Sequence, residues 1–316
     1  MRLVFAGSPA AAVPSLTALA ARDDHEVVAV VTRDDTPQGR RRVLTPTPVA
    51  VEAERLGLPV VRARRLDDDV TARLAALEPD LGVVVAYGAL VREPLLSTPR
   101  HGWVNLHFSL LPRWRGAAPV QRALLAGDRV TGADVFRLVP ELDAGEVLGR
   151  LEHRLRGDET AGELLGTLSV AGADLLVEVV AALAAGTAVS APQEGDVTLA
   201  PKLVLADGRL DLTAPAGAVL DRWRGVTPEP GAHATFAGEP FKVHELRRVD
   251  VDAGTGAGGA GTAPAPGVLV LHGRRVLVGT GSEPLELVRV QPAGKKAMAA
   301  ADSWRGLAER ADRRLA

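Results

Sequence analysis

The segment 103–119, with the sequence WVNLHFSLLPRWRGAAP, holds the residue types best suited to chemistry in this chain. Side chains on a strand alternate between two faces, so Asn105 and His107 are expected to point the same way. An asparagine amide can donate a hydrogen bond to a developing oxyanion, and histidine suits proton transfer near neutral pH. Taken alone, the pair equally fits the end of a strand with a buried, hydrogen-bonded histidine.

The residues after this predicted strand favour a ligand site. An Arg-Trp-Arg cluster at 113–115 precedes Gly116, and before it the chain leaves the strand through Ser109, Leu110, Leu111 and Pro112. Open α/β sheets bind their ligands where strand ends lead into such loops. We therefore expect Asn105 and His107 to belong to a site rather than to a plain strand end.

A carboxylate is predicted at the same edge of the sheet. Asp143 stands in the segment ELDAGEV, after a strand that is predicted to end near Val139. Asp-x-Gly is a turn signal, and a simple Asx turn accounts for it. The functional interpretation is that Asp143 orients or charge-stabilises His107, as acids do in other catalytic groups. The spacing alone leaves both interpretations open.

A basic loop follows the second predicted strand. The segment 33–47, RDDTPQGRRRVLTPT, places Arg40, Arg41 and Arg42 side by side. Runs of charge usually form solvated loops, which is the first interpretation here. A long Arg-rich loop beside a site can also bind phosphates.

Composition excludes several kinds of chemistry. The 316 residues contain no cysteine, so a disulfide scaffold, a thiolate nucleophile, an iron–sulfur cluster and Cys-based zinc sites are excluded. None of the seven histidines forms an H-x-x-x-H or H-E-x-x-H pair, and we expect no metal. The first turn, FAGSP, supplies only one glycine of the G-x-G-x-x-G pattern, which disfavours NAD.

The elements that must position these residues alternate along the first part of the chain. Apolar runs predict strands at Leu3–Ala6, Val27–Thr32, Val60–Val61 and Leu81–Ala86. Apolar residues at three- and four-residue spacing predict helices between them, at Ala10–Ala21, Val49–Leu56 and Val70–Leu77. Such alternation is typical of an α/β fold with a parallel sheet. The domain, expected over residues 1–186, is completed by strands at Trp103–Phe108 and Ala133–Val139 and helices at Pro119–Leu125 and Ala161–Ala185.

The second part has a different texture. Residues 187–203 are rich in Gly, Thr, Ser, Pro and Gln and are expected to form a linker. Beyond Leu203 the helical pattern disappears, and residues 204–316 are expected to form a small β-barrel. Its strands are predicted at Ala232–Phe236, Phe241–Leu246, Gly267–Leu271, Arg275–Gly279 and Leu285–Val290. The low-complexity segment 253–267 is expected to be a mobile loop.

Charge and hydropathy indicate a cytoplasmic protein. Residues 201–316 carry 16 Lys and Arg against 13 Asp and Glu, whereas residues 1–200 carry 21 against 26. The contrast weakly suggests a polyanion near the second part. The apolar start is broken at Pro9 and Pro14, which argues against a signal peptide. The longest uninterrupted apolar stretch, Leu81–Val91, has 11 residues, and we expect no membrane contact.

Taken together, these motifs resemble the folate-dependent formyltransferases, and among them the members that act on methionyl-tRNA. The segment 105–119 is similar to the family signature, and FAGSP at 5–9, VVVAYG at 83–88 and LDAGEV at 142–147 also match in order. QPAGKKAM at 291–298 resembles the hallmark of the tRNA-specific members. The resemblance spans nearly the whole chain. It implies a Rossmann-like, mostly parallel N-terminal domain and an OB-like C-terminal β-barrel domain.

The resemblance also implies an activity and a set of roles. The formyl group of 10-formyltetrahydrofolate, a co-substrate, would pass to the α-amino group of methionine on initiator tRNA, supplying formylmethionyl-tRNA for translation initiation. Asn105 would stabilise the oxyanion, His107 would assist proton transfer, and Asp143 would orient or charge-couple His107. The implied folate pocket comprises Ser109, Leu110, Leu111 and Pro112, with Tyr87 and Gly88. The implied tRNA contacts are Arg40, Arg41, Arg42, Lys295 and Lys296.

Two alternatives stay open at this point. One is a formyltransferase that acts on a small amine, glycinamide ribonucleotide or an amino sugar; the separate basic barrel argues against it. The other is a non-catalytic RNA-binding protein, against which the joint presence of Asn105, His107 and Asp143 argues. We expect a monomer.

Overall fold

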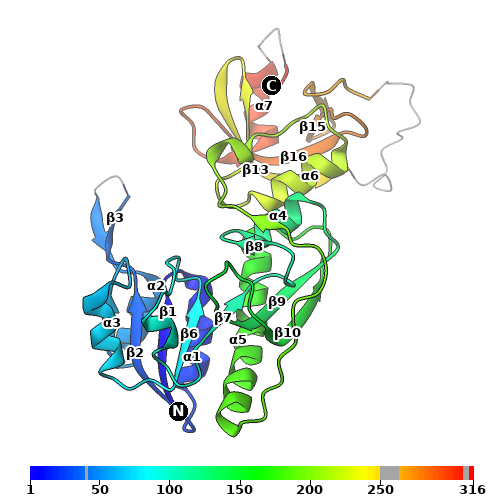
Figure 1. Cartoon of the computed structure of the whole chain (residues 1–316). Helices are drawn as coiled ribbons and strands as arrows, with labels where there is room; N and C mark the ends of the chain where they lie inside the picture. Colours follow the sequence, from blue (N-terminus) through cyan, green and yellow to red (C-terminus); the bar gives the residue numbers. More distant parts are fainter. Residues whose placement is uncertain (40–41, 250–262, 309–312) are drawn as a thin grey trace. The chain divides into compact units, whose positions relative to one another are not determined.

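The computed structural model describes residues 1–39, 42–249, 263–308 and 313–316, and the chain forms two compact units. The first unit comprises Met1–Val120, Arg129–Leu155 and Glu163–Pro201. The second comprises Gln121–Asp128, Arg156–Gly162 and Lys202–Ala316. Figure 1 shows their elements in sequence colours.

A seven-stranded sheet forms the centre of the first unit, in the order β10-β9-β7-β6-β1-β2-β5 (Figure 1). Strands β1, β2, β5, β6 and β7 pair in parallel, whereas β9 and β10 are antiparallel to their neighbours. This arrangement confirms the mostly parallel α/β fold. The bounds are β1 Arg2–Gly7, β2 Glu26–Thr32, β5 Val60–Arg62, β6 Leu81–Val85, β7 Trp103–His107, β9 Val130–Arg137 and β10 Val147–Arg154.

The helices of this unit begin at local signals in the sequence. The Thr47 side chain accepts a hydrogen bond from the backbone of Ala50, and the Asp67 side chain accepts one from Val70. Both satisfy a backbone N–H in the first turn of a helix. The helix predicted at 10–21 begins instead as a 3₁₀ turn, η1 (Ala10–Ala12). The α-helices of this unit are α1 (Val13–Ala20), α2 (Pro48–Arg55), α3 (Asp68–Ala75) and α5 (Ala161–Ala185). Most of α4 (Pro119–Leu125) belongs to the second unit.

The long apolar helix α5 packs against the sheet. A Cβ added at Gly172 would lie 3.0 Å from Leu106 of β7, so the helix approaches that strand closely. On β10, Gly149 makes room for Leu175 and Val179 of the helix. By length and composition α5 is the one helix among the described residues that could cross a membrane. In this structure α5 packs on β7 and β10.

A short hairpin projects from the sheet in Figure 1. It consists of β3 (Thr36–Gln38) and β4 (Val43–Thr45), which pair antiparallel. Arg42 is exposed, with a left-handed backbone (φ 48°). Arg40 and Arg41 lie outside the described residues.

The second unit contains an antiparallel sheet in the order β12-β13-β16-β15-β14, with β17 beside β16. Residues Leu315 and Ala316 pair with β12, and Arg313 to Leu315 pair with the chain at β14. The C-terminal segment therefore bonds to both edge strands of the curled sheet, which agrees with the predicted barrel. The bounds are β12 His233–Phe236, β13 Glu239–Arg248, β14 Leu269–His272, β15 Arg275–Val278, β16 Leu285–Pro292 and β17 Met298–Ala299.

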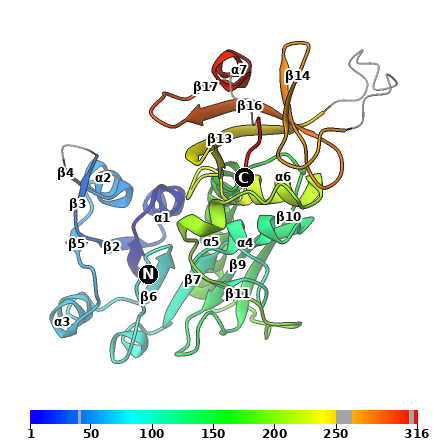
Figure 2. The same cartoon turned by 90° about the horizontal axis from the view of Figure 1, so that it is seen from above.

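The prediction that helices are absent beyond Leu203 is wrong. The second unit contains α6 (Ala216–Gly225) and α7 (Ala300–Ala308), and α7 packs against β16, next to β17 in Figure 2. In α6, Val219, Leu220 and Trp223 are buried in the barrel core. Both helices are short and contain glycine, which hid their period. Residues 253–262 of the predicted mobile loop lie outside the described residues.

Candidate active site

Strand β7 presents Asn105 and His107 beside β6 and β9. Asn105 aligns with Val84 of β6 and with Phe136 of β9. Val104 and Leu106 on either side of Asn105 are fully buried, whereas Asn105 is half-buried. Alternate residues of a strand face opposite sides of the sheet. Val104 and Leu106 therefore lie on one side, and Asn105 and His107 on the other.

The His107 ring is held by the loop that follows its own strand. Its Nε2 lies 2.9 Å from the carbonyl oxygen of Trp114, and its ring packs edge-on against Phe136. A carbonyl oxygen can only accept, so Nε2 carries the proton in this hydrogen bond. In the neutral ring, the lone pair is therefore on Nδ1. That nitrogen lies 3.9 Å from Oδ2 of Asp143.

Asp143 is fixed by its backbone and by one hydrogen bond. It adopts a left-handed conformation, with φ 46°, and its Oδ2 accepts a hydrogen bond of 2.8 Å from the backbone N–H of Gly116. At 3.9 Å from Nδ1, Oδ2 of Asp143 lies beyond hydrogen-bond distance of the ring. The ring orientation comes from Trp114 and Phe136.

The loop 109–112 is anchored by an ion pair that sequence reasoning missed. Asp134 of β9 accepts a hydrogen bond of 2.8 Å from the N–H of Leu111, and Arg150 of β10 donates one of 2.7 Å to the Leu111 carbonyl. Arg150 also binds Asp134 through two nitrogens. The available signal was a lone carboxylate within the apolar run of β9. Ser109, fully buried, donates to the carbonyl of Arg113.

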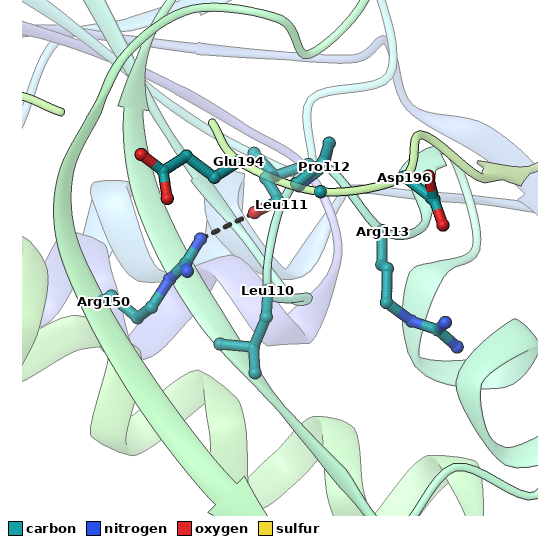
Figure 3. A pocket seen from close by; sticks show the side chains of 8 residues that line it. Leu110, Leu111, Pro112, Arg113, Arg150, Glu194 and Asp196 are labelled. Carbon is teal, nitrogen blue, oxygen red and sulfur yellow. Dashed lines mark hydrogen bonds between the residues drawn. The ribbon is translucent and has the colours of Figure 1, made fainter. Parts of the chain in front are cut away.

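Burial and charge act in opposite directions on this pair. Asp134 is fully buried, and the loss of solvent raises the pKa of its carboxyl while Arg150 lowers it. Figure 3 shows the guanidinium of Arg150 directed at the Leu111 carbonyl. A cavity of about 280 Å³ adjoins the loop, lined by Leu110, Leu111, Pro112, Arg113, Arg150, Glu194, Gly195 and Asp196.

Tyr87 and Gly88 follow the carboxyl end of β6, next to β7. The Tyr87 ring is buried, and its hydroxyl donates to the carbonyl of Ala63. This burial raises the pKa of Tyr87 to about 12. The Gly88 carbonyl accepts a hydrogen bond of 2.7 Å from Arg33. The buried Tyr87 side chain therefore anchors the loop after β6, and Ala86 and Gly88 on either side of it are exposed.

The predicted residues thus separate into two groups. His107 and Asp143 lie 3.9 Å apart at the carboxyl end of β7, Asn105 stands two residues earlier on the same strand, and the loop 109–112 follows it. The basic residues lie elsewhere: Arg42 is on the β3–β4 hairpin, while Lys295 and Lys296 are exposed in the turn between β16 and β17 of the second unit. Within the described ranges, no group of three His, Asp or Glu residues is placed to hold a metal ion.

The arrangement at β7 is suited to acyl transfer to an amine. Nδ1 of His107 can take a proton, and the Asn105 amide can donate to a developing oxyanion. Leu110, Leu111 and Pro112 line the adjoining cavity.

Comparison with known proteins agrees with this chemistry. The formyl transferase family model matches residues 1–180, and the model of the formyl transferase C-terminal domain matches residues 202–308. A methionyl-tRNA formyltransferase of Leifsonia xyli is 64% identical over 306 residues, covering 97% of each chain.

Solved structures share the fold at low identity. An N-formyltransferase from Helicobacter canadensis, in complex with folinic acid and dTDP-3-aminofucose, has a TM-score of 0.66 at 12% identity, covering 92% of this chain and 98% of its own. HypX from Aquifex aeolicus, in complex with tetrahydrofolic acid, has a TM-score of 0.60 at 15% identity, covering 95% of this chain and 46% of its own. With two family models in order and a full-length relative at this identity, the chain belongs to the methionyl-tRNA formyltransferase family.

Proposed function

We propose that this chain transfers the formyl group of 10-formyltetrahydrofolate to the α-amino group of methionine on initiator tRNA. The observation that carries the proposal is His107 beside Asp143 at the end of β7, with Asn105 two residues before it, in a chain 64% identical over 97% of its length to a methionyl-tRNA formyltransferase. Residues 1–186 form the domain that catalyses formyl transfer, and residues 204–316 form the domain that contacts the tRNA. Residues 187–203 connect the two domains. The enzyme acts as a cytoplasmic monomer.

The residues present fit a folate co-substrate. After β6, Ala86 and Gly88 are exposed, and their backbone groups can bond to a polar heterocycle. After β7, Leu110, Leu111 and Pro112 line a cavity with apolar side chains. When bound, 10-formyltetrahydrofolate supplies a formyl group on nitrogen.

Each site residue then has one task. As the amine nitrogen bonds to the formyl carbon, the Asn105 amide donates to the formyl oxygen, where negative charge develops. His107 accepts the amine proton at Nδ1 and returns it to the departing nitrogen. Asp143, 3.9 Å away, favours the charged ring between these steps, and the hydrogen bond to the Trp114 carbonyl leaves Nδ1 facing Asp143.

The acceptor is tested by incubating the protein with 10-formyltetrahydrofolate labelled in the formyl group and separate acceptors. These are charged initiator tRNA, charged elongator tRNA, glycinamide ribonucleotide and an amino-sugar nucleotide. We expect label on methionine of the initiator tRNA. Label on a small amine alone would overturn the proposed acceptor, and no transfer to any of them would overturn the proposed activity.

A further inference from the structure

The segment expected to be a plain linker lies against both loops of the site. Ala191 exchanges two backbone hydrogen bonds with Val147, of 2.8 and 2.9 Å. Further along, β11 (Leu199–Ala200) pairs in parallel with β8 (Arg115–Gly116). Between these two anchors, the Thr198 hydroxyl accepts from the N–H of Trp114, the residue whose carbonyl binds His107. Residues 191–200 therefore brace the site from outside.

One side chain of this brace, Gln193, touches both loops. Its Nε2 donates to the carbonyls of Asp143 and Gly145, each at 2.8 Å. Its Oε1 accepts from Nε and Nη2 of Arg115, at 3.1 and 2.6 Å. A guanidinium only donates and carbonyls only accept, so the orientation of the amide is unambiguous. All four bonding positions of the amide are used.

The turn that Gln193 holds is one that needs support. Asp143 has a left-handed backbone, which costs free energy for residues other than glycine. Gly145 packs so closely that an added Cβ would lie 1.8 Å from the carbonyl oxygen of Arg137. Gln193 binds the carbonyl at each of these two positions. The direction of the Asp143 side chain depends on this backbone.

We propose that Gln193 is a positioning residue for Asp143, and that it sets the distance between the carboxylate and His107 Nδ1. This inference rests on the proposed role of Asp143 in formyl transfer. Gln193 itself touches neither His107 nor a reacting atom in these contacts. Its effect reaches the chemistry through the turn 143–145, and a displacement of about 1 Å in such a turn can cost about 10²-fold in rate.

Two substitutions remove different parts of the Gln193 amide. Gln193→Glu keeps an oxygen for Arg115 but loses both N–H donors and places a carboxylate against two carbonyls. Gln193→Met has similar length and lacks both functions. We expect kcat to fall about 10- to 10²-fold in each variant, with KM for 10-formyltetrahydrofolate within about twofold of wild type. Ser190→Ala is the matched control, because Ser190 lies in the same segment and donates only to exposed Glu146.

Combination with Asp143→Asn shows whether Gln193 acts through that carboxylate. We expect kcat of the double variant Gln193→Glu/Asp143→Asn to lie within about twofold of kcat of Asp143→Asn alone, because the positioned charge is already absent. Multiplied losses, or normal kcat in both Gln193 variants, would overturn the positioning role while leaving formyl transfer intact. If Gln193→Glu does not fold, the same cycle is run with Gln193→Met. Normal kcat in Asp143→Asn would overturn the role of Asp143 and this inference with it.

Discussion

The end of β7 and the β3–β4 hairpin carry the two groups of functional residues predicted in the first unit, and they are built in opposite ways. At β7, His107 is 6% exposed and its ring is bonded to Trp114, while Gly116 and Gln193 hold Asp143. On the hairpin, Val43 and Leu44 are 60% and 63% exposed. Only three residue pairs join β3 and β4 of the hairpin.

This difference follows from what each region is proposed to do. Proton transfer and oxyanion stabilisation depend on distances near 3 Å, so their side chains need fixed neighbours. Contact with phosphates depends mainly on positive charge, so it does not need side chains held at one fixed distance. Changes at β7 should therefore alter kcat, and changes on the hairpin should alter tRNA affinity and its salt dependence.

The largest effect is expected from removing the oxyanion donor. Asn105→Ala should lower kcat by about 10²–10³-fold, the typical cost of losing one such donor. Folate affinity and the salt dependence of tRNA binding should stay near wild type, because the change is confined to β7. Steady-state kinetics at saturating charged tRNA measure it. A variant with near-normal kcat would remove Asn105 from the chemistry.

The next largest effect is expected on stability, from breaking the ion pair between Asp134 and Arg150 that anchors the loop 109–112. Asp134→Ala leaves the Leu111 N–H unpaired and strands the charge of Arg150. We expect the free energy of unfolding to fall by about 2–3 kcal/mol, less than for a fully buried pair because Arg150 is 42% exposed and can turn into solvent.

Urea denaturation of Asp134→Ala beside Glu26→Ala provides the comparison. Glu26 pairs with Arg2 at the surface, where both side chains are well exposed, so its loss should cost less than about 1 kcal/mol. Equal losses in the two variants would show that the Asp134 pair does not anchor the loop.

The hairpin gives the opposite phenotype. Replacing Arg40, Arg41 and Arg42 by Ala should flatten the dependence of log K on log salt by roughly two to three units and raise KM for charged tRNA. The value of kcat at saturating tRNA and the folate affinity should change little. Parallel salt slopes for the variant and wild type would mean that these arginines form only a solvated loop.

The smallest effect concerns the helix that follows the hairpin. In α2, hydrogen bonds from Arg55 and then Thr17 lower the pKa of Glu52 to about 2, from an ordinary value of 4.5. A lowered pKa stabilises the fold above pH 4.5, and that contribution is lost as pH falls toward 2. Glu52→Gln should therefore lose less stability than wild type between pH 5 and pH 3. Urea midpoints at the two pH values measure the difference, and equal losses would contradict the ion pair.

Local patterns predicted much of the frame of the site. The apolar alternation around Asn105 and His107 predicted β7, and the apolar period of 161–185 predicted α5 with the bounds observed. β10 was missed because it lies at the sheet edge, where charged residues alternate with half-buried ones. α6 and α7 were missed because each spans few turns and depends on the barrel core for its stability.

Local sequence patterns could not predict the contacts that complete the site, because these contacts join residues far apart in the sequence. Arg150 and Asp134 are neighbours only because β9 and β10 pair in one register. Gln193 lies 50 residues after Asp143 and looked like part of a polar linker. Hydrogen bonds over such separations are fixed by tertiary structure, and neither composition nor periodicity carries them.

The most direct test of the account is the double-variant cycle of His107→Ala and Asp143→Asn, measured as kcat for formylation of charged initiator tRNA. Asp143→Asn keeps the shape of the side chain and removes the charge that favours the imidazolium. We predict a loss of at least about 10²-fold for this variant, with a changed pH–rate profile. The double variant should be about as slow as His107→Ala alone. Losses that multiply would show that the carboxylate and the imidazole act separately, contradicting the proposed site.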